Sequence, residues 1–233
     1  MKYYYDLHIH SVLSPCADDL MTPNNIFNMA NLKKLNIISV TDHNSLKQLS
    51  ICYELSQSYD MLFIPGVELE VQEGFHLLCY FKHVDEALAF DAFLESHIHK
   101  QRYDHELYGK QAITNLDDEI IDYFPYHLTN SLTLSFEDLL FSLKHYDHIL
   151  VYAHLNREKN SGLSYLNQYP LDAIELTKHV QAGFIHQHQL TNHKILFNSD
   201  AHQIIDISEI NDKNEMELES LTIEAFFEYF NNG

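Results

Sequence analysis

The stretch YYYDLHIH, residues 3–10, ends an apolar run with two histidines, His8 and His10. If the run is a β-strand, residues two apart point to the same face, so the two imidazoles project together from the strand end. Imidazoles directed at one point commonly share a metal ion. The pair alone is equally compatible with histidines that bind no metal, and the rest of the chain decides between these interpretations.

The composition predicts one globular domain over residues 1–233. Of the 233 residues, 45% are hydrophobic, and the 6 glycines and 5 prolines form no low-complexity linker. This apolar content is sufficient for a sizeable core. No apolar run approaches the ~20 residues that cross a bilayer, and the N-terminus lacks a signal sequence. We therefore expect a cytoplasmic protein without membrane partners, whose oligomeric state the sequence does not specify.

The three cysteines, Cys16, Cys52 and Cys79, are odd in number and widely spaced. This argues against a disulfide framework and suits a reducing compartment. Cys16 follows the histidine pair closely. It is either an additional metal ligand or a small packed side chain, and the second interpretation is favoured because free cysteine usually behaves as a small hydrophobic residue.

The charge of the chain limits its partners. The net charge is −20, and the two arginines are Arg102 and Arg157. Such a surface repels nucleic-acid backbones at long range, so we expect no binding of long duplex nucleic acid. A cluster of divalent cations would reverse the sign locally and attract phosphate.

Strand and helix patterns alternate along the chain. Strand-type apolar runs occupy residues 3–9, 37–43, 61–71, 75–81, 148–154, 172–177 and 194–202. Helical patterns occupy 22–36, 45–59, 85–101, 135–146 and 222–230. Thr22 and Ser135 are the expected N-caps of two of these helices, and Pro23 stands at a first helical position. Residues 103–133 form an irregular excursion with loops or a short hairpin. The alternation predicts an α/β fold with a mainly parallel sheet.

Histidine and carboxylate side chains lie in or at the end of nearly every predicted strand. They are His8, His10, His43, Glu68, His76, His154, Asp200 and His202. In parallel α/β folds the carboxyl ends of the strands meet on one side, where active sites are built. Packing does not explain such a set, because each buried polar group without a partner costs several kcal/mol. Cations would satisfy these groups collectively.

The ligand types indicate the metals. Nitrogen and carboxylate ligands without thiolates suit zinc, manganese or iron. With one loop carboxylate the set reaches nine groups, too many for one ion and enough for two or three. A carboxylate such as Glu68 can bridge two ions. This arrangement is typical of metal-assisted hydrolysis, in which the ions activate water and stabilise the leaving oxygen.

The order of these motifs resembles the PHP family of metal-dependent phosphoesterases, named for its polymerase and histidinol-phosphatase members. The motifs are H-x-H at residues 8–10, S-x-x-x-D at 14–18, T-D-H at 41–43, G-x-E at 66–68, H-L-L at 76–78, A-H at 153–154 and S-D-A-H at 199–202. They span nearly the whole chain, and their common order is far more specific than any one of them. The resemblance implies a distorted, seven-stranded TIM-like (β/α)7 barrel of PHP type, with three divalent metal ions at the strand ends.

The resemblance also implies the metal ligands. The first ion would be held by His8, His10, Glu68 and Asp200, the second by Glu68 as a bridge with His76 and His154, and the third by Asp18, His43 and His202. Asp18 is preferred to Asp19 because the family's loop aspartate falls there when the loop proline is aligned with Pro23.

Two further carboxylates near these motifs are assigned other positions. Glu70 is the rival of Glu68, whose spacing from Gly66 fits the G-x-E motif. Asp42 is expected to orient a neighbouring histidine rather than to bind metal itself. The residues expected to take a direct part in catalysis are Glu68, His154 and Asp200.

Basic residues near the strand ends are candidates for substrate contacts. Many relatives have proline after the A-H histidine, where this chain has Leu155. Arg157 follows at a position from which it would grip a phosphate bidentately, and an exposed surface arginine is the alternative. Lys178 and His179 follow the strand at 172–177, and Lys110 in the irregular excursion is a weaker candidate.

We therefore expect a metal-dependent phosphoesterase that hydrolyses a small phosphomonoester, a nucleotide or a short oligonucleotide end. One alternative is a metal-dependent amidohydrolase acting on a carbon centre, although no lysine at a strand end is an obvious bridging ligand. The other is a protein that uses metal for structure or sensing, although structural zinc sites are usually closed sets of four ligands, often thiolates.

Overall fold

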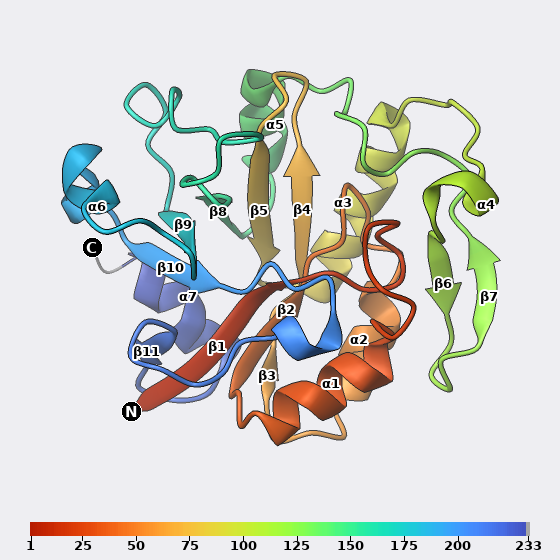
Figure 1. Ribbon diagram of the computed structural model, residues 1–233, viewed down its shortest axis with the longest axis horizontal. Coiled ribbons are helices and arrows are strands. Elements are labelled where there is room, and N and C mark those ends of the chain that lie inside the picture. The colour runs from red at the N-terminus through yellow and green to blue at the C-terminus, as the bar shows by residue number, and fades with distance from the viewer. Residues whose placement is uncertain (232–233) are drawn as a thin grey trace.

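The computed structural model describes residues 1–231 (Figure 1). The strands are β1 (Lys2–Ile9), β2 (Ile37–Val40), β3 (Leu62–Phe63), β4 (Gly66–Glu70), β5 (His76–Phe81), β6 (Ala112–Thr114), β7 (Ile120–Tyr123), β8 (His148–Tyr152), β9 (Ala173–Thr177), β10 (Ile195–Asn198) and β11 (Glu215–Glu217). The helices are α1 (Pro23–Leu32), α2 (Leu49–Ser56), α3 (Val84–His97), α4 (His105–Tyr108), α5 (Phe136–Leu143), α6 (Phe184–Gln187) and α7 (Ile223–Asn231), with 3-10 turns η1 (Leu190–Asn192) and η2 (Ile204–Asp206).

The element order confirms the predicted α/β class. Every predicted strand is present, although the run at 61–71 divides into β3 and β4 around Pro65, which has no N–H for a ladder hydrogen bond. The excursion at 103–133 contains the short helix α4 and the hairpin β6–β7, which stands apart from the main sheets at the right of Figure 1.

The helix signals are also confirmed. The Thr22 side chain accepts a hydrogen bond from the backbone N–H of Asn25 at the start of α1, and Pro23 opens the helix. The Ser135 side chain caps α5 by accepting from Asp138 N–H. Helix α1 ends at Leu32, earlier than predicted, because Lys34 turns the chain with a φ of +61°. Within residues 1–231, no helix is both long and apolar enough to cross a bilayer.

The strands form two main sheets rather than one mainly parallel sheet. One has the order β11-β1-β2-β3 and the other the order β10-β9-β8-β5-β4. The triplets β1-β2-β3 and β8-β9-β10 are parallel, whereas β4-β5-β8 and the pair β1-β11 are antiparallel. The prediction of a mainly parallel sheet was therefore wrong for the β4-β5-β8 half of the molecule.

The two sheets meet along two seams, and in the described part of the chain they do not close into a continuous barrel. Single bridges, Ile9 with Ala201 and His43 with Glu68, connect them. Along the seam between β1 and β10, the Asn198 side chain accepts from Leu7 N–H at 2.9 Å. At this point of the seam a side-chain bond takes the place of a ladder bond. The structure confirms the α/β class that the resemblance implied, but within residues 1–231 it does not show the distorted seven-stranded barrel.

The second seam depends on a glycine. Gly66 begins β4 where it approaches β2, and a Cβ at this position would lie 2.4 Å from Oγ of Ser39. That hydroxyl donates to the carbonyl of Ile64 at 2.7 Å and fixes the chain entering β4. Only glycine allows this approach, which brings Glu68 beside the end of β2.

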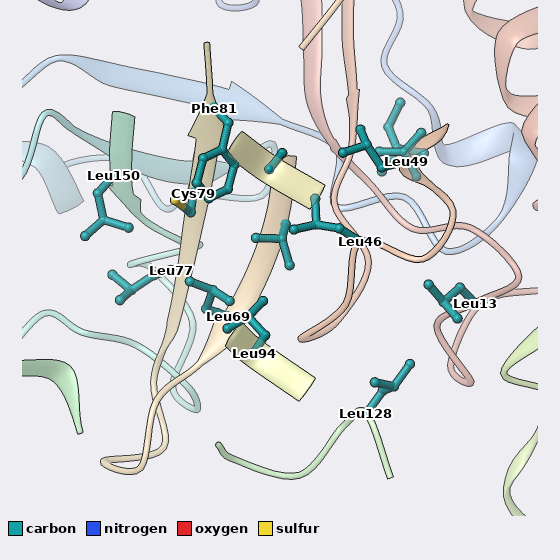
Figure 2. Packing of buried hydrophobic residues seen from close by; sticks show 14 of the residues in the cluster. Leu13, Leu46, Leu49, Leu69, Leu77, Cys79, Phe81, Leu94, Leu128 and Leu150 are labelled. Atoms are coloured by element: carbon teal, nitrogen blue, oxygen red, sulfur yellow. The ribbon is translucent and has the colours of Figure 1, made fainter. Parts of the chain in front are cut away.

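Two apolar clusters hold the fold together. The larger includes Leu69 of β4, Leu94 of α3, and Cys79 and Phe81 of β5 (Figure 2). The smaller cluster lies between the sheets and is covered by α7, whose Phe226 is fully buried. Burial of such side chains contributes roughly 1.5–3 kcal/mol each. The polar strand ends are therefore supported on rigid elements.

Candidate metal centre

His8 and His10 are buried, and their rings converge. Nε2 of His8 and Nε2 of His10 lie 3.1 Å apart. The opposite nitrogens are both occupied: His8 Nδ1 is 2.9 Å from Glu175 Oε1, and His10 Nδ1 is 3.0 Å from Ser14 Oγ. If these Nδ1 atoms carry the protons, both Nε2 atoms present lone pairs to the same space, as metal ligands do.

Glu68 is the centre of the site. Its Oε1 lies 2.9 Å from His76 Nδ1 and 3.1 Å from His154 Nε2. Its Oε2 lies 2.9 Å from His43 Nδ1, without hydrogen-bond geometry. The closest nitrogens of His8 and His10 are 3.3 and 3.4 Å away. One buried carboxylate therefore touches side chains from several strand ends, as a bridging ligand would.

Asp200 completes the other side of the centre. Its Oδ1 lies 3.2 Å from His10 Nε2 and 3.3 Å from His8 Nε2. Its Oδ2 pairs with the Arg157 guanidinium. Neither oxygen has a hydrogen bond of good geometry among the described residues, although the side chain is 2% exposed.

Buried unpaired groups of this kind fit divalent cations. Within residues 1–231, three groups of possible ligands have donor atoms within 4.8 Å of one another. They are His8 with His10 and Asp200; His43 with Glu68 and His76; and His10 with His43 and His202. Burying such groups without partners would cost several kcal/mol each, whereas cations bind all of them.

The backbone is strained at two of these residues. His154 has a φ of +30° and Asp200 a φ of +52°. For residues other than glycine, such sparsely populated backbone conformations cost about 1–3 kcal/mol each. They concentrate at functional sites. The strain aims both side chains at the centre, just beyond β8 and β10.

The electrostatic environment keeps the carboxylates ionised. Burial would raise the pKa of Glu68, but His76, His8 and His43 outweigh it and hold that pKa well below its usual range. Burial likewise opposes ionisation of Asp200, yet His8 and His10 lower its pKa. Positive charge beside these carboxylates is therefore what keeps them ionised, and a bound cation would supply it in place of protons on the histidines.

The surroundings shift the pKa values of His8 and His10 in opposite directions. Burial opposes a charge on His8, but Glu175, Asp200 and Glu68 raise its pKa well above the usual value. Burial, reinforced by His202 and His43, lowers the pKa of His10 well below that value. Protons and metal ions therefore compete for the same nitrogens.

The structure does not bring Asp18 into any of the three groups formed by residues 1–231. Its side chain is exposed, and its Oδ1 accepts from Leu20 N–H at 2.9 Å. Cys16, on the same loop, lies outside the three groups as well. Partial burial would raise the pKa of its thiol, but the nearby His202 and His43 outweigh this effect and lower the pKa to about 6.

Asp42 and Glu70 lie beside the centre. Asp42 accepts from Ser11 N–H at 2.7 Å and from Ser14 Oγ at 2.6 Å, and Ser14 is the residue that contacts His10. Asp42 therefore acts on His10 through Ser14. Glu70 Oε2 lies 3.1 Å from Nε2 of His76, on the ring edge away from Glu68.

Sequence reasoning missed Glu175. From β9 it contacts His8, accepts from His154 N–H at 2.7 Å and accepts from Asn198 Nδ2 at 2.7 Å. A single carboxylate within the apolar run AIELT, residues 173–177, was the available signal. A fully buried charge in a strand needs partners, and here the partners are two residues of the centre.

The predicted substrate-contact residues lie together beside Asp200. Arg157, Lys178 and His179 line an open cavity of about 390 Å³ that also includes Asn156, Thr177, Ser199, Asp200 and Asp206. Lys178 Nζ is 3.7 Å from Asp206 Oδ1. Lys110 does not belong to this cavity and pairs with Asp19 at 2.8 Å.

Comparison with known proteins identifies the fold. No family model matches the sequence, and no curated protein matches it. The lesion-specific endonuclease PfuEndoQ from Pyrococcus furiosus aligns over 100% of this chain and 57% of its own, with 20% identity and a TM-score of 0.72. A second endonuclease Q structure, described as a complex with a 27-mer duplex substrate, aligns with a TM-score of 0.68 at 19% identity, over 100% of this chain and 57% of its own. The chain thus spans a little over half the length of these endonuclease chains.

Two further structures align with this chain over almost their whole length. A protein assigned as a metal-dependent phosphoesterase from Bifidobacterium adolescentis aligns over 98% of this chain and 96% of its own, with 17% identity and a TM-score of 0.55. An amidohydrolase from Chromobacterium violaceum, described with bound sulfate and no metal, aligns over 97% and 96%, with 17% identity and a TM-score of 0.64. These likenesses show a shared α/β fold.

Proposed function

We propose that this chain is a metal-dependent phosphoesterase of the PHP type. The observation that carries the proposal is the contact of one buried carboxylate, Glu68, with histidines from several strand ends, beside the buried carboxylate of Asp200. Such a cluster of buried ligands fits two or three divalent ions better than any packing role. The fold shared with a lesion-specific endonuclease and an assigned phosphoesterase supports it.

The ligands divide between the ions as follows. His8, His10 and Asp200 would hold the first ion, His76 and His154 the second, and His43 and His202 the third, with Glu68 between the first two. When bound, the ions supply an activated water and neutralise charge on the phosphoryl oxygens. Zinc, manganese and iron all suit these nitrogen and oxygen donors.

The protein itself contributes orientation and substrate binding. Glu175 fixes the His8 ring and the backbone of His154, so that both point to the centre. Arg157 at the rim of the cavity is suited to grip a phosphate bidentately, and Lys178 and His179 add positive charge on the same side. The burial of the ligands keeps bulk water away from the charged centre.

The substrate class that this cavity favours is a small phosphomonoester, a nucleotide or an exposed end of a nucleic acid. The net charge of −20 opposes binding of a long duplex at long range. That expectation has no support from the comparisons, because one endonuclease Q structure is described with a duplex substrate. Duplex DNA therefore belongs among the substrates to be tested.

A second candidate function is hydrolysis at a carbon centre. The amidohydrolase from Chromobacterium violaceum shares the fold, which favours this alternative over a non-catalytic one. Lys178, which lines the cavity, pairs with Asp206 rather than with a proposed metal ligand. The two reactions are distinguished by the turnover of three chromogenic substrates with the same preparation: a p-nitrophenyl phosphate, a p-nitrophenyl carboxylate ester and a p-nitroanilide.

The experiment that tests the proposal uses metal-replete protein. We expect turnover of phosphate esters that a chelator removes and that Zn²⁺ or Mn²⁺ restores. His10→Ala and Asp200→Ala are expected to abolish turnover in folded protein, whereas the exposed controls His186→Ala and Asp212→Asn retain it. Full activity in either ligand variant, or preferential cleavage of the carboxylate ester or anilide, contradicts the proposal.

A further inference from the structure

A second cavity adjoins the cavity beside Asp200. The cavity beside Asp200 measures about 390 Å³ and its neighbour about 350 Å³, and both have Lys178 and Asp206 in their walls. Phe197 of β10 lines the second cavity, and Ser199, roughly 7 Å further along the extended chain, lines the first. A ligand held beside Asp200 can therefore extend past Lys178 into the second cavity.

The charge around the joined cavities differs from that of the whole chain. The chain has 14 lysines and arginines against 34 carboxylates. The walls of the two cavities hold four such cations against three carboxylates, namely Arg157, Lys33, Lys178 and Lys213 with Asp200, Asp206 and Glu209. Because Asp200 is assigned to the first ion, this region would attract anions once the metal is bound.

Lys213 is the free cation of the second cavity. Salt bridges occupy Lys178 and Lys33 there, whereas Lys213 has none within residues 1–231. Its ammonium lies 5.3 Å from the centre of the Phe197 ring. Its backbone is held on both sides, because its N–H donates to Asn211 Oδ1 at 2.9 Å and its carbonyl accepts from Tyr5 Oη at 3.4 Å. The positive charge is therefore positioned before any ligand arrives.

The outer wall of the second cavity is fixed by two anchors from other elements. Nζ of Lys33, at the end of α1, donates to the carbonyl of Ile205 at 2.9 Å and pairs with Glu209 at 3.0 Å. Asp6 of β1 is fully buried, and its Oδ2 accepts from Ser208 N–H at 2.8 Å. The cavity is thus preformed, which lowers the entropic cost of binding.

Lys178 stands between the two cavities and is available to a ligand. Its Nζ lies 3.7 Å from Asp206 Oδ1, and both side chains are about half exposed. Exposed pairs of this kind contribute little to stability, so a phosphate between the cavities can draw Lys178 away from Asp206. Ile205, 77% exposed, adds an apolar surface to the second cavity that a nucleoside would cover and a bare phosphate would not.

We propose that the second cavity binds the next phosphate of a nucleotide chain whose scissile phosphate lies at the metal centre. Lys213 and Lys178 are the cations that contact this second phosphate, and Ile205 contacts the nucleoside. The inference rests on the proposed function and narrows its substrate class from phosphomonoesters in general to the ends of nucleic-acid strands. Lys213 then determines specificity, because a substrate with a single phosphate does not reach it.

Kinetics with two matched substrates test the inference. 5′-Phosphorylated dithymidylate (pTpT) has the second phosphate, and thymidine 5′-phosphate (pT) lacks it. On zinc-loaded protein we expect kcat/KM, measured by release of inorganic phosphate, to be about tenfold higher for pTpT than for pT. Lys213→Glu is expected to raise KM for pTpT about tenfold with a smaller effect on pT, whereas Lys213→Arg keeps the preference.

The matched control is another lysine that lies over an aromatic ring. Nζ of Lys144 is 5.5 Å from the centre of the exposed Phe141 ring, on α5 and its C-terminal cap. Lys144→Glu changes the net charge of the chain as Lys213→Glu does. It is expected to leave the ratio of the two kcat/KM values as in the wild type.

Binding provides a measurement that does not depend on turnover. The probe is a phosphonate analogue of pTpT, in which CH₂ replaces the ester oxygen that would be cleaved at each phosphate. Isothermal titration of zinc-loaded protein is expected to show about tenfold weaker binding in Lys213→Glu than in the wild type or in Lys144→Glu. The difference should shrink as salt is added, because the lost contact is ionic.

The outcomes separate this inference from the proposed function. Equal kcat/KM for pTpT and pT, or a preference and an analogue affinity that Lys213→Glu leaves unchanged, overturns the second phosphate site while the phosphoesterase proposal stands. An equal loss in Lys144→Glu also overturns it, because net charge alone then explains the effect. Lys213-dependent binding of the analogue by a protein that hydrolyses no phosphate ester supports the site and contradicts the proposed reaction instead.

Discussion

Glu175 on β9 lies 2.9 Å from Nδ1 of His8 on β1, a contact across 167 residues of sequence. The second oxygen of the same carboxylate accepts the backbone N–H of His154 at 2.7 Å. One side chain therefore contacts the ring of a proposed ligand of the first ion, His8, and the backbone of a proposed ligand of the second ion, His154. Glu175 is a positioning residue, since it faces the outer edges of the ligands rather than the space between them.

Replacement of this residue is expected to weaken metal binding. Glu175→Gln keeps the size of the side chain but removes the charge that favours Nδ1–H on His8. Loss of such an outer partner typically costs about 10–100-fold in metal affinity. Competition with a chromophoric chelator measures the affinity, and the exposed variant Glu219→Gln is the matched control. Unchanged affinity in folded Glu175→Gln would show that the contact is merely structural.

The stability of metal-free protein is expected to fall with rising pH. Burial lowers the pKa of His76, but Glu68 and Glu70 outweigh it and raise the pKa to about 9. A group whose pKa is raised on folding contributes stability that is complete below its unfolded value of about 6.5 and is lost as pH rises through the folded value. Metal-free protein is thus less stable at pH 9.5 than at pH 6.5.

Urea unfolding at the two pH values measures this difference. Zinc-loaded protein is expected to lose no stability over the same interval, because bound metal requires neutral histidines. His76→Asn is expected to flatten the dependence in metal-free protein. Equal free energies of unfolding for the metal-free wild type at both pH values would contradict the assigned charge on His76.

A methyl group at Gly66 is expected to open the seam between β2 and β4. The added Cβ would lie 2.4 Å from Ser39 Oγ and 2.9 Å from Thr41 Cγ2, in a packed interior. Overpacking of this kind costs about 1–3 kcal/mol. Because Glu68 follows two residues later, Gly66→Ala is also expected to weaken metal binding.

Urea unfolding and metal titration of the same variant check both effects. Gly66→Ala combined with Ser39→Ala removes the closest contact and is expected to recover part of the stability. If Gly66→Ala is as stable as the wild type, the seam is looser than its contacts indicate.

The candidate ligands could be predicted because the signal is local. His8 and His10 are two apart on a strand, and His154 and Asp200 directly follow apolar runs, so their common location follows from the α/β architecture. Glu175 could not be paired with His8 in this way, because a carboxylate inside a strand carries no sign of which distant residue it faces.

The loop and the seams required three-dimensional information. Asp18 lies in an irregular loop, where backbone bonds such as Ala17 N–H to Ser14 O set the course of the chain and leave the Asp18 carboxylate exposed. The open seam between β1 and β10 depends on Asn198 replacing a ladder partner of Leu7. Neither feature has a periodic pattern in the sequence, so the family spacing that assigned Asp18 and implied a distorted seven-stranded barrel carried no information about them.

Removal of the guanidinium at Arg157 is expected to impair substrate binding more than metal binding. In the structure Arg157 pairs with Asp200 Oδ2 while lining the adjacent cavity. A cation bound by Asp200 competes for that carboxylate and frees the arginine for a substrate phosphate. Loss of such a charge-assisted contact costs about 1.5–3 kcal/mol, so Arg157→Ala should raise KM for a phosphate ester about 10–100-fold with a smaller effect on kcat.

Arg157→Lys keeps the charge without the bidentate geometry and should fall between the wild type and Arg157→Ala. The other arginine, Arg102, is exposed, and Arg102→Ala is the matched control, with unchanged kinetics. Isothermal titration with metal is expected to show equal or tighter binding in Arg157→Ala, because Asp200 loses its competing cation. A fall in metal affinity with unchanged KM would place Arg157 in support of the centre and would leave the substrate phosphate to Lys178 and His179.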